Sequence, residues 1–134
     1  MTVSLATAVR NAKLDAITTQ IGNAGLLRIY DGTPPASANA SLSGNNKLAE
    51  LVCGSPFAAG SSSAQLTASA IATESSANAT GTASFYRLYK SDGSTCIAQG
   101  TVGTSGSDLN LNTTSIVSGG PVACSSFTYT EGNA

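Results

Sequence analysis

The chain of 134 residues contains no histidine and no tryptophan, and only 10% of its residues are charged. Histidine is the commonest general base, pH switch and zinc ligand, so its absence removes the usual basis for such sites. Globular proteins carry about 25% charged residues, so this chain has little charge to display. With a net charge of −1, the chain lacks the basic surface of a nucleic-acid-binding protein, so we expect no nucleic-acid partner.

Cysteine is sparse, and long apolar runs are missing. Cys53, Cys96 and Cys124 form no Cys-x-x-Cys pair, so we expect three buried thiols, with one disulfide plus a free thiol as the alternative. No apolar stretch approaches the about 18 residues that a membrane-spanning helix needs, so we expect no membrane partner. Arg10 and Lys13 interrupt the apolar positions near the start. This pattern predicts that the chain has no secretory signal and that it is synthesised in a cytoplasm.

Small residues dominate what is present. Ala, Ser, Thr and Gly occur 21, 20, 16 and 14 times, while Leu, Ile, Val, Met and Phe together number only 27. That shortage of large apolar residues approaches the range of disordered proteins, but disorder also requires a high net charge, and the large residues here cluster into short segments. We therefore expect a single folded domain over residues 1–134 with a thin core.

A helical pattern covers residues 4–21, with Ser4 as the expected N-cap and Gly22 or Gly25 at its end. Its apolar residues form two faces about 120–180° apart. One face carries Leu5, Ala8, Val9, Ala12 and Ala16, and the other carries Leu14, Ile17 and Ile21. Two apolar faces suit a helix held between its own β domain and either a partner or a second element of the same fold.

Short β-forming segments separated by turn signals fill the rest of the chain. The expected strands cover 26–30, 47–53 with Leu48 and Val52 inward, 66–73, 80–90, 95–102, 109–112 and 122–130. Asp92-Gly93 predicts a type I′ hairpin, and the long polar segment 36–46 predicts a functional or mobile loop. This spacing is typical of a sandwich, jelly roll or barrel.

The expected fold class is therefore mainly β. We predict a β-sandwich or jelly roll of about seven or eight short antiparallel strands over residues 26–130, preceded by one N-terminal α-helix over residues 1–22.

No motif carries recognisable chemistry. Serine is abundant, but a serine nucleophile needs an activating base, and neither Ser-x-x-Lys nor Gly-x-Ser-x-Gly occurs. The G-x-x-G-x-x-G of residues 100–106 matches neither common phosphate-binding spacing. The Asp-x-Asn-x-Asn of residues 108–112 lacks the glycine and glutamate of a calcium loop. We expect no enzymatic activity, no cofactor and no metal.

The strand expected over residues 80–90 carries the chain's aromatic-basic cluster. Phe85, Arg87 and Tyr89 share one face, and Tyr86 and Leu88 share the other. If Tyr86 and Leu88 are core, the first three present an interface of a Tyr/Arg type. If Phe85 and Tyr89 are core, Arg87 must extend to solvent or find a partner. With the second helix face, the candidate interface residues are Leu14, Ile17, Ile21, Phe85, Arg87 and Tyr89.

Longer stretches of the sequence resemble a known class of proteins. The stretches are SLATAVRNAKLDAITTQIG followed by GLLRIYDGTPPA, then ANATGTASFYRLYKSDGST, DLNLNTTSI and the closing SFTYTEGNA. They are similar to small virion proteins encoded in the structural modules of tailed bacteriophages. The similarity covers most of the chain and is weakest over residues 36–46 and 55–65.

This resemblance implies a non-enzymatic structural protein of the virion, made in the cytoplasm of the host bacterium. Within that class we expect a cement, or decoration, protein on the capsid surface that binds the major capsid protein and itself, as a homodimer or homotrimer. The alternatives are a head–tail connector or tail component of the same virion, or a carbohydrate-binding, adhesin-like module. The resemblance assigns no contact to any individual residue.

Overall fold

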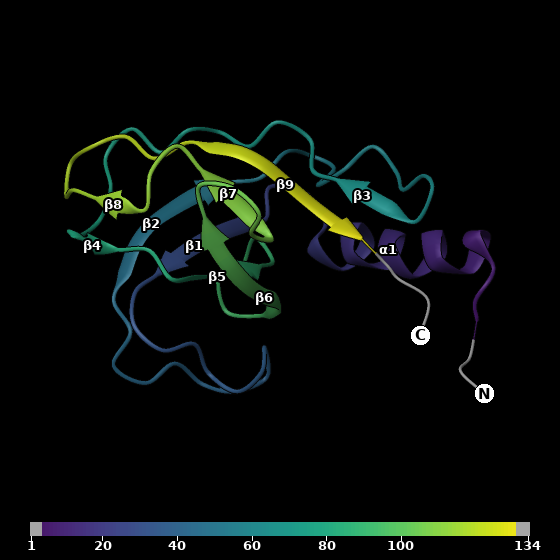
Figure 1. Cartoon of the computed structure of the whole chain (residues 1–134), viewed down its shortest axis with the longest axis horizontal. Coiled ribbons are helices and arrows are strands. Elements are labelled where there is room, and N and C mark those ends of the chain that lie inside the picture. Colours follow the sequence, from purple (N-terminus) through teal and green to yellow (C-terminus); the bar gives the residue numbers. More distant parts are fainter. Residues whose placement is uncertain (1–3, 131–134) are drawn as a thin grey trace.

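The computed structural model describes residues 4–130, and it is mainly β with one N-terminal helix, as expected (Figure 1). In chain order, the elements are α1 (Thr7–Ile21), β1 (Leu26–Tyr30), β2 (Lys47–Val52), β3 (Gln65–Thr67), β4 (Gly81–Thr82), β5 (Phe85–Tyr89), β6 (Cys96–Gly103), β7 (Leu109–Leu111), β8 (Ser115–Ile116) and β9 (Cys124–Thr130). No helix in this part of the chain is long and apolar enough to cross a membrane.

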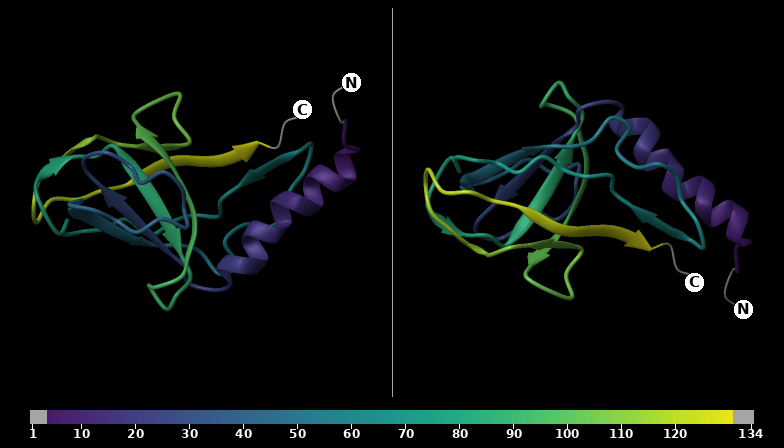
Figure 2. Two further views of the ribbon diagram at one scale, coloured as in Figure 1. Left: turned by 90° about the horizontal axis from the view of Figure 1, so that it is seen from below. Right: turned by 90° about the horizontal axis from the view of Figure 1, so that it is seen from above.

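Seven strands form one sheet in the order β2-β1-β5-β6-β7-β9-β3, and β4 pairs with β8 in a separate ribbon. The sheet curls into a half-barrel (Figure 2). A sandwich or jelly roll is not confirmed. The expectation that every strand is antiparallel is wrong, because β6 and β7 run parallel.

The parallel pair depends on a tight loop. Residues 104–108 form a loop that brings Leu109, at the start of β7, opposite Val102, near the end of β6. The loop is closed by Asp108, whose carboxylate accepts hydrogen bonds from the backbone N–H and the hydroxyl of Thr101, both at 3.1 Å. Parallel neighbours usually need a crossover of a dozen or more residues, so such a short connection was not expected from the sequence.

The helix is shorter at its start than expected. It begins after Ala6, which occupies the N-cap position without any side-chain hydrogen bond, so the prediction of Ser4 as N-cap is wrong. At the other end the N–H of Gly22 donates to the carbonyl of Thr18, and Gly22 has a φ of +72° that favours glycine. Its ψ of −147° lies outside the αL region. Gly22 therefore ends the helix, but without an αL cap.

The observed strands agree best with the expected ones where the side chains are large. The strand over residues 26–30 is confirmed, whereas the one expected over 80–90 divides into β4 and β5 and β8 was missed. Only residues 65–67 of the segment expected at 66–73 form a strand. Its remainder is rich in Ala, Ser and Thr, which offer little area to bury, and its N–H groups bond to separate partners instead of one ladder.

Two local expectations are wrong. Val52 points outward and is 45% exposed, while Leu48 is fully buried as expected. In the hairpin turn Gly93 has a φ of +73°, but Asp92 has no positive φ, so the turn is not type I′. The Asp92 carboxylate instead accepts the N–H groups of Ser94 and Thr95, which fixes a wider turn.

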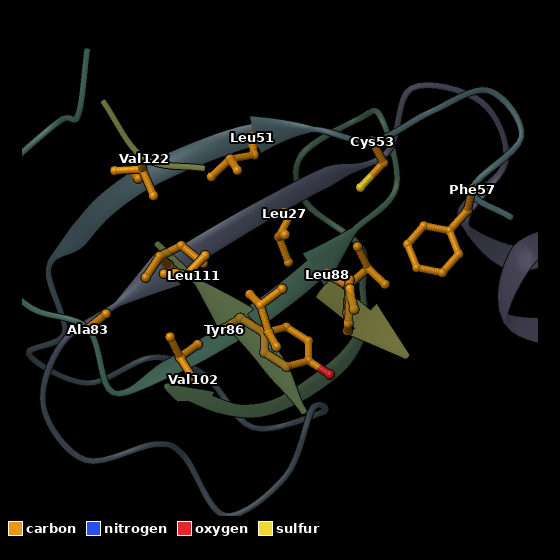
Figure 3. Packing of buried hydrophobic residues seen from close by; sticks show 14 of the residues in the cluster. Leu27, Leu51, Cys53, Phe57, Ala83, Tyr86, Leu88, Val102, Leu111 and Val122 are labelled. Carbon is orange, nitrogen blue, oxygen red and sulfur yellow. The ribbon is translucent and has the colours of Figure 1, made fainter. Parts of the chain in front are cut away.

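The core fills the inside of the curl. Leu27 lies opposite Leu88 and Ile29 opposite Tyr86, so alternate residues of β1 and β5 point inward together. Figure 3 shows Leu27, Tyr86 and Leu88 directed toward side chains from the other strands. The ring of Phe127 on β9 closes this interior, because its centroid lies 5.0 Å from that of Tyr86.

Gly100 on β6 makes room for the largest side chain of the core. A Cβ at this position would lie 2.8 Å from the ring and hydroxyl of Tyr86 and from the carboxylate of Asp108. The Tyr86 hydroxyl also forms a short hydrogen bond with that of Tyr129. A side chain at position 100 would therefore displace the ring around which β5, β6 and β9 pack.

Removing the ring of Phe127 tests this packing. Phe127 is 3% exposed and contacts Phe57, Tyr86 and Tyr129. We expect Phe127→Ala to lower the free energy of unfolding by about 3–5 kcal/mol, as measured by denaturant unfolding. Val117→Ala is the control, because Val117 is 61% exposed, and its effect should stay within about 0.5 kcal/mol. A change below about 1 kcal/mol for Phe127→Ala would contradict the packing described.

Candidate functional site

α1 binds its own domain through one of the two apolar faces. Leu14 and Ile21 are 3% and 2% exposed and belong to the core, and Ile17 packs partly buried against it. These three predicted interface residues are therefore covered by the chain itself. The opposite face points to solvent, with Val9 47% exposed and Ala12 also exposed.

Polar contacts fix the orientation of the helix. The carboxylate of Asp15 accepts the N–H of Ser61 at 2.8 Å, and the amide oxygen of Asn11 accepts the N–H of Ala64 at 2.9 Å. Ser61 also donates its hydroxyl to the Asn11 carbonyl. These contacts hold α1 beside the segment that leads into β3 (Figure 1). The exposed face is thus presented at a fixed angle.

β5 is buried on both faces, which neither of the two sequence-based alternatives anticipated. All residues from Phe85 to Tyr89 are buried. Tyr86 and Leu88 face the core, while Phe85 stacks on Tyr30 with ring centroids 5.3 Å apart on the outer face. Phe85, Arg87 and Tyr89 are only 1%, 4% and 6% exposed. In this chain they are covered side chains, not an exposed surface.

The polar segment over residues 31–46 provides that cover through its backbone carbonyls. The Arg87 guanidinium donates from Nη2 to the carbonyls of Ser37 and Ala40. Gln99 on β6 donates to the carbonyl of Pro35 at 2.7 Å and accepts a hydrogen bond from Arg87 Nε at 3.1 Å. The loop is therefore attached to the outer face of the sheet at several points.

Strand register assembles a row of polar side chains on this face. Glu50, Arg28, Arg87 and Gln99 lie opposite one another across β2, β1, β5 and β6. Arg28 Nε donates to the Glu50 carboxylate at 2.6 Å, and the Arg28 guanidinium lies 4.7 Å over the Tyr89 ring. Two arginines directly opposite each other repel. Arg87 and Tyr89 were candidate residues on the basis of the sequence, but the row was not predicted, because the row depends on the pairing of distant strands.

Glu50 is the only carboxylate in this row. Burial alone would raise its pKa, but the hydrogen bond from Arg28 and the charges of Lys47 and Arg28 outweigh burial and hold the pKa of Glu50 below its ordinary value. Lys47 Nζ lies 3.5 Å from the same Glu50 oxygen. One carboxylate is therefore shared by two cations, and Arg87 has no part in it.

A cavity of about 540 Å³ opens where the loop and the β5–β6 hairpin meet. Its loop side is formed by residues 38–42, and its sheet side by Arg87, Tyr89 and residues 94–96. The cavity therefore combines mostly short side chains, both polar and apolar, with the ring of Tyr89 and one buried cation, Arg87. Small-molecule sites typically measure about 300–1,000 Å³, so the volume is sufficient for a small ligand.

All three cysteines are free thiols. Cys53 is buried, while Cys96 and Cys124 are half-buried. Burial first, and the neighbouring Cys124 second, raise the pKa of the Cys53 thiol to about 12. Within residues 4–130 no group of three or more His, Cys, Asp or Glu side chains is placed to hold a metal ion.

Comparisons of this chain with protein families, with curated proteins and with solved structures found no match.

Glutamine at position 50 tests the charge balance of the row. Because the folded pKa of Glu50 is lowered, its ionised form stabilises the fold at neutral pH, and this contribution is lost as the pH falls below about 4.3 toward the folded pKa. We expect Glu50→Gln to lower the free energy of unfolding by about 1 kcal/mol at pH 7. The gap to the unmodified chain should shrink below pH 4, as followed by thermal unfolding.

Glu74→Gln is the matched control, since the Glu74 carboxylate accepts a backbone N–H from Ser76 and has no ion-pair partner among residues 4–130. A gap for Glu50→Gln that stays constant from pH 7 to pH 3 would show that Glu50 does not act through its charge.

Proposed function

We propose that this chain is a non-enzymatic structural protein of a tailed-bacteriophage virion, and that it acts as a cement protein on the capsid surface. Its partners would be the major capsid protein and further copies of itself, as a homodimer or homotrimer. The resemblance in the sequence supports the class, and the character of the exposed surface supports the role.

The observation that carries the proposal is the scarcity of exposed charge. Among the exposed residues of 4–130, only Lys13, Asp92 and Asp108 are charged, and most others are Ser, Thr, Asn, Ala or Gly. A small domain designed to stay soluble on its own is given about 25–35% charged residues on its surface. Short uncharged side chains lose little rotamer entropy on contact, and they are less costly to desolvate than charges. Such a surface suits burial against other protein in a repeated assembly.

The exposed face of α1 is the docking element in this proposal. It extends beyond the curled sheet at one end of the molecule (Figure 2), and its polar contacts with residues 61–64 hold it in place. Ala12 and Ala16 allow a neighbouring backbone to approach closely, and Val9 supplies apolar area. As a cement, the protein would bury this face against shell subunits and so raise the free energy needed to separate them.

Charge introduced on this face tests docking. Deleting residues 1–21 would also remove buried Leu14 and Ile21 from the core, so surface substitutions give a cleaner result. We expect the double variant Val9→Glu, Ala12→Glu to lose at least about tenfold in affinity for purified shells, because carboxylates would be buried without partners. Co-sedimentation with shells stripped of this protein measures the loss.

Val117→Glu is the matched control, because Val117 is exposed beside β8, away from α1 (Figure 1). It should bind as the unmodified chain does, and both variants should keep their melting temperature. Equal shell binding by the double variant and the control would refute docking through α1.

The copy number in purified virions tests the function itself. Quantitative mass spectrometry should find this chain in an amount comparable to the major capsid protein. A small fraction of that amount would assign it to the connector or tail instead. Absence from the particle would contradict the proposal and would favour the carbohydrate-binding alternative.

A further inference from the structure

Arg87 is a buried cation whose hydrogen-bond partners are all neutral. It is 4% exposed, and it donates to the Gln99 side chain and to the carbonyls of Ser37 and Ala40. No carboxylate within residues 4–130 lies in ion-pair distance of it. Neutral oxygens satisfy N–H groups, but they leave the charge itself uncompensated in a poorly solvated place.

The surrounding charges increase this imbalance. Arg28 lies directly opposite Arg87 in the strand register, and Glu50 is already shared between Arg28 and Lys47. Asp92 belongs to the neighbouring hairpin turn, where its carboxylate accepts the N–H groups of residues 94 and 95 and the hydroxyl of residue 95. The outer face of the sheet therefore lacks negative charge at Arg87.

The cavity of about 540 Å³ lies where that negative charge is missing. Arg87 forms part of its wall. Nε and Nη2 of Arg87 are bonded to the protein, whereas Nη1 has no hydrogen bond to the part of the chain that the structure describes and is not fully enclosed. Because Arg87 lines the cavity, the two N–H groups of Nη1 can donate hydrogen bonds to an anion bound there.

We infer that this cavity is a binding site for a carboxylate group, with Arg87 Nη1 as the charged donor. Ser41 and Ser94 line the same cavity, and their hydroxyl groups can donate to the second carboxylate oxygen. A phosphate carries about −1.5 to −2 charge and is usually held by several cationic or backbone donors. One free guanidinium nitrogen among neutral hydroxyls matches a single negative charge better. This inference does not rest on the proposed function.

The carboxylate can belong to a small organic acid or to an Asp or Glu side chain of another protein, since the chemistry of recognition is the same. The test is an NMR titration of the ¹⁵N-labelled full chain at constant ionic strength. The probes are sodium acetate, N-acetyl-glutamate amide and sodium phosphate, with sodium chloride as the reference salt.

We expect saturable amide shifts for acetate and for N-acetyl-glutamate amide, confined to residues 38–42 and 94–96, with a dissociation constant on the order of 1 mM. Tighter binding of acetate identifies a free acid, and tighter binding of N-acetyl-glutamate amide identifies an acidic side chain. Either result supports the site. Tighter binding of phosphate than of both, or shifts that never saturate, would overturn it.

Two sets of variants separate binding from folding. Arg87→Gln should weaken acetate binding at least about tenfold, but it also removes bonds that hold the loop. Ser41→Glu and Ser41→Gln leave Arg87 intact and differ only in charge. The tethered carboxylate of S41E should occupy the site, so S41E should bind acetate at least about tenfold more weakly than S41Q. Equal acetate affinity of S41E and S41Q would contradict the inference.

Discussion

Burial of β5 on both faces is the constraint on which the rest of the structure depends. Its inner face packs into the half-barrel, and its outer face carries Arg87 between two aromatic rings. A strand buried on both faces needs a second covering layer. Here that layer is the segment 31–46, a long polar loop that has no strand of its own. Backbone carbonyls of this loop accept hydrogen bonds from the Arg87 guanidinium and so attach the loop to the outer face of the sheet.

The sequence predicted those parts of the fold that large side chains determine. Leu26–Tyr30 and the neighbourhood of Phe85–Tyr89 were recognisable because apolar and aromatic residues fill four of the five positions in each strand. β4 and β8 have two residues each, too few for any periodicity. The parallel pairing of β6 with β7 was also not predictable, because a connection as short as residues 104–108 is usually too short to join parallel neighbours.

The candidate site shows the same division. Periodicity separated the two faces of α1, but only packing decided that Leu14 and Ile21 turn inward while Val9 stays exposed. Arg87 was singled out from its neighbours in the sequence, yet its partners come from distant segments. Non-local pairing of this kind leaves no local signal in the chain, and without it neither the polar row nor the cavity could be foreseen.

The surface and the site describe different aspects of one molecule. An exterior with few exposed charges suits extensive contact with other protein, while Arg87 lies buried beneath the 31–46 segment. Both the burial of Arg87 and the cavity beside it require that residues 31–46 stay fixed against the sheet. ¹⁵N relaxation of the backbone amides of residues 36–42 tests this directly. We predict order parameters of about 0.85, equal to those of β1 and β5, and values below about 0.6 would contradict the account.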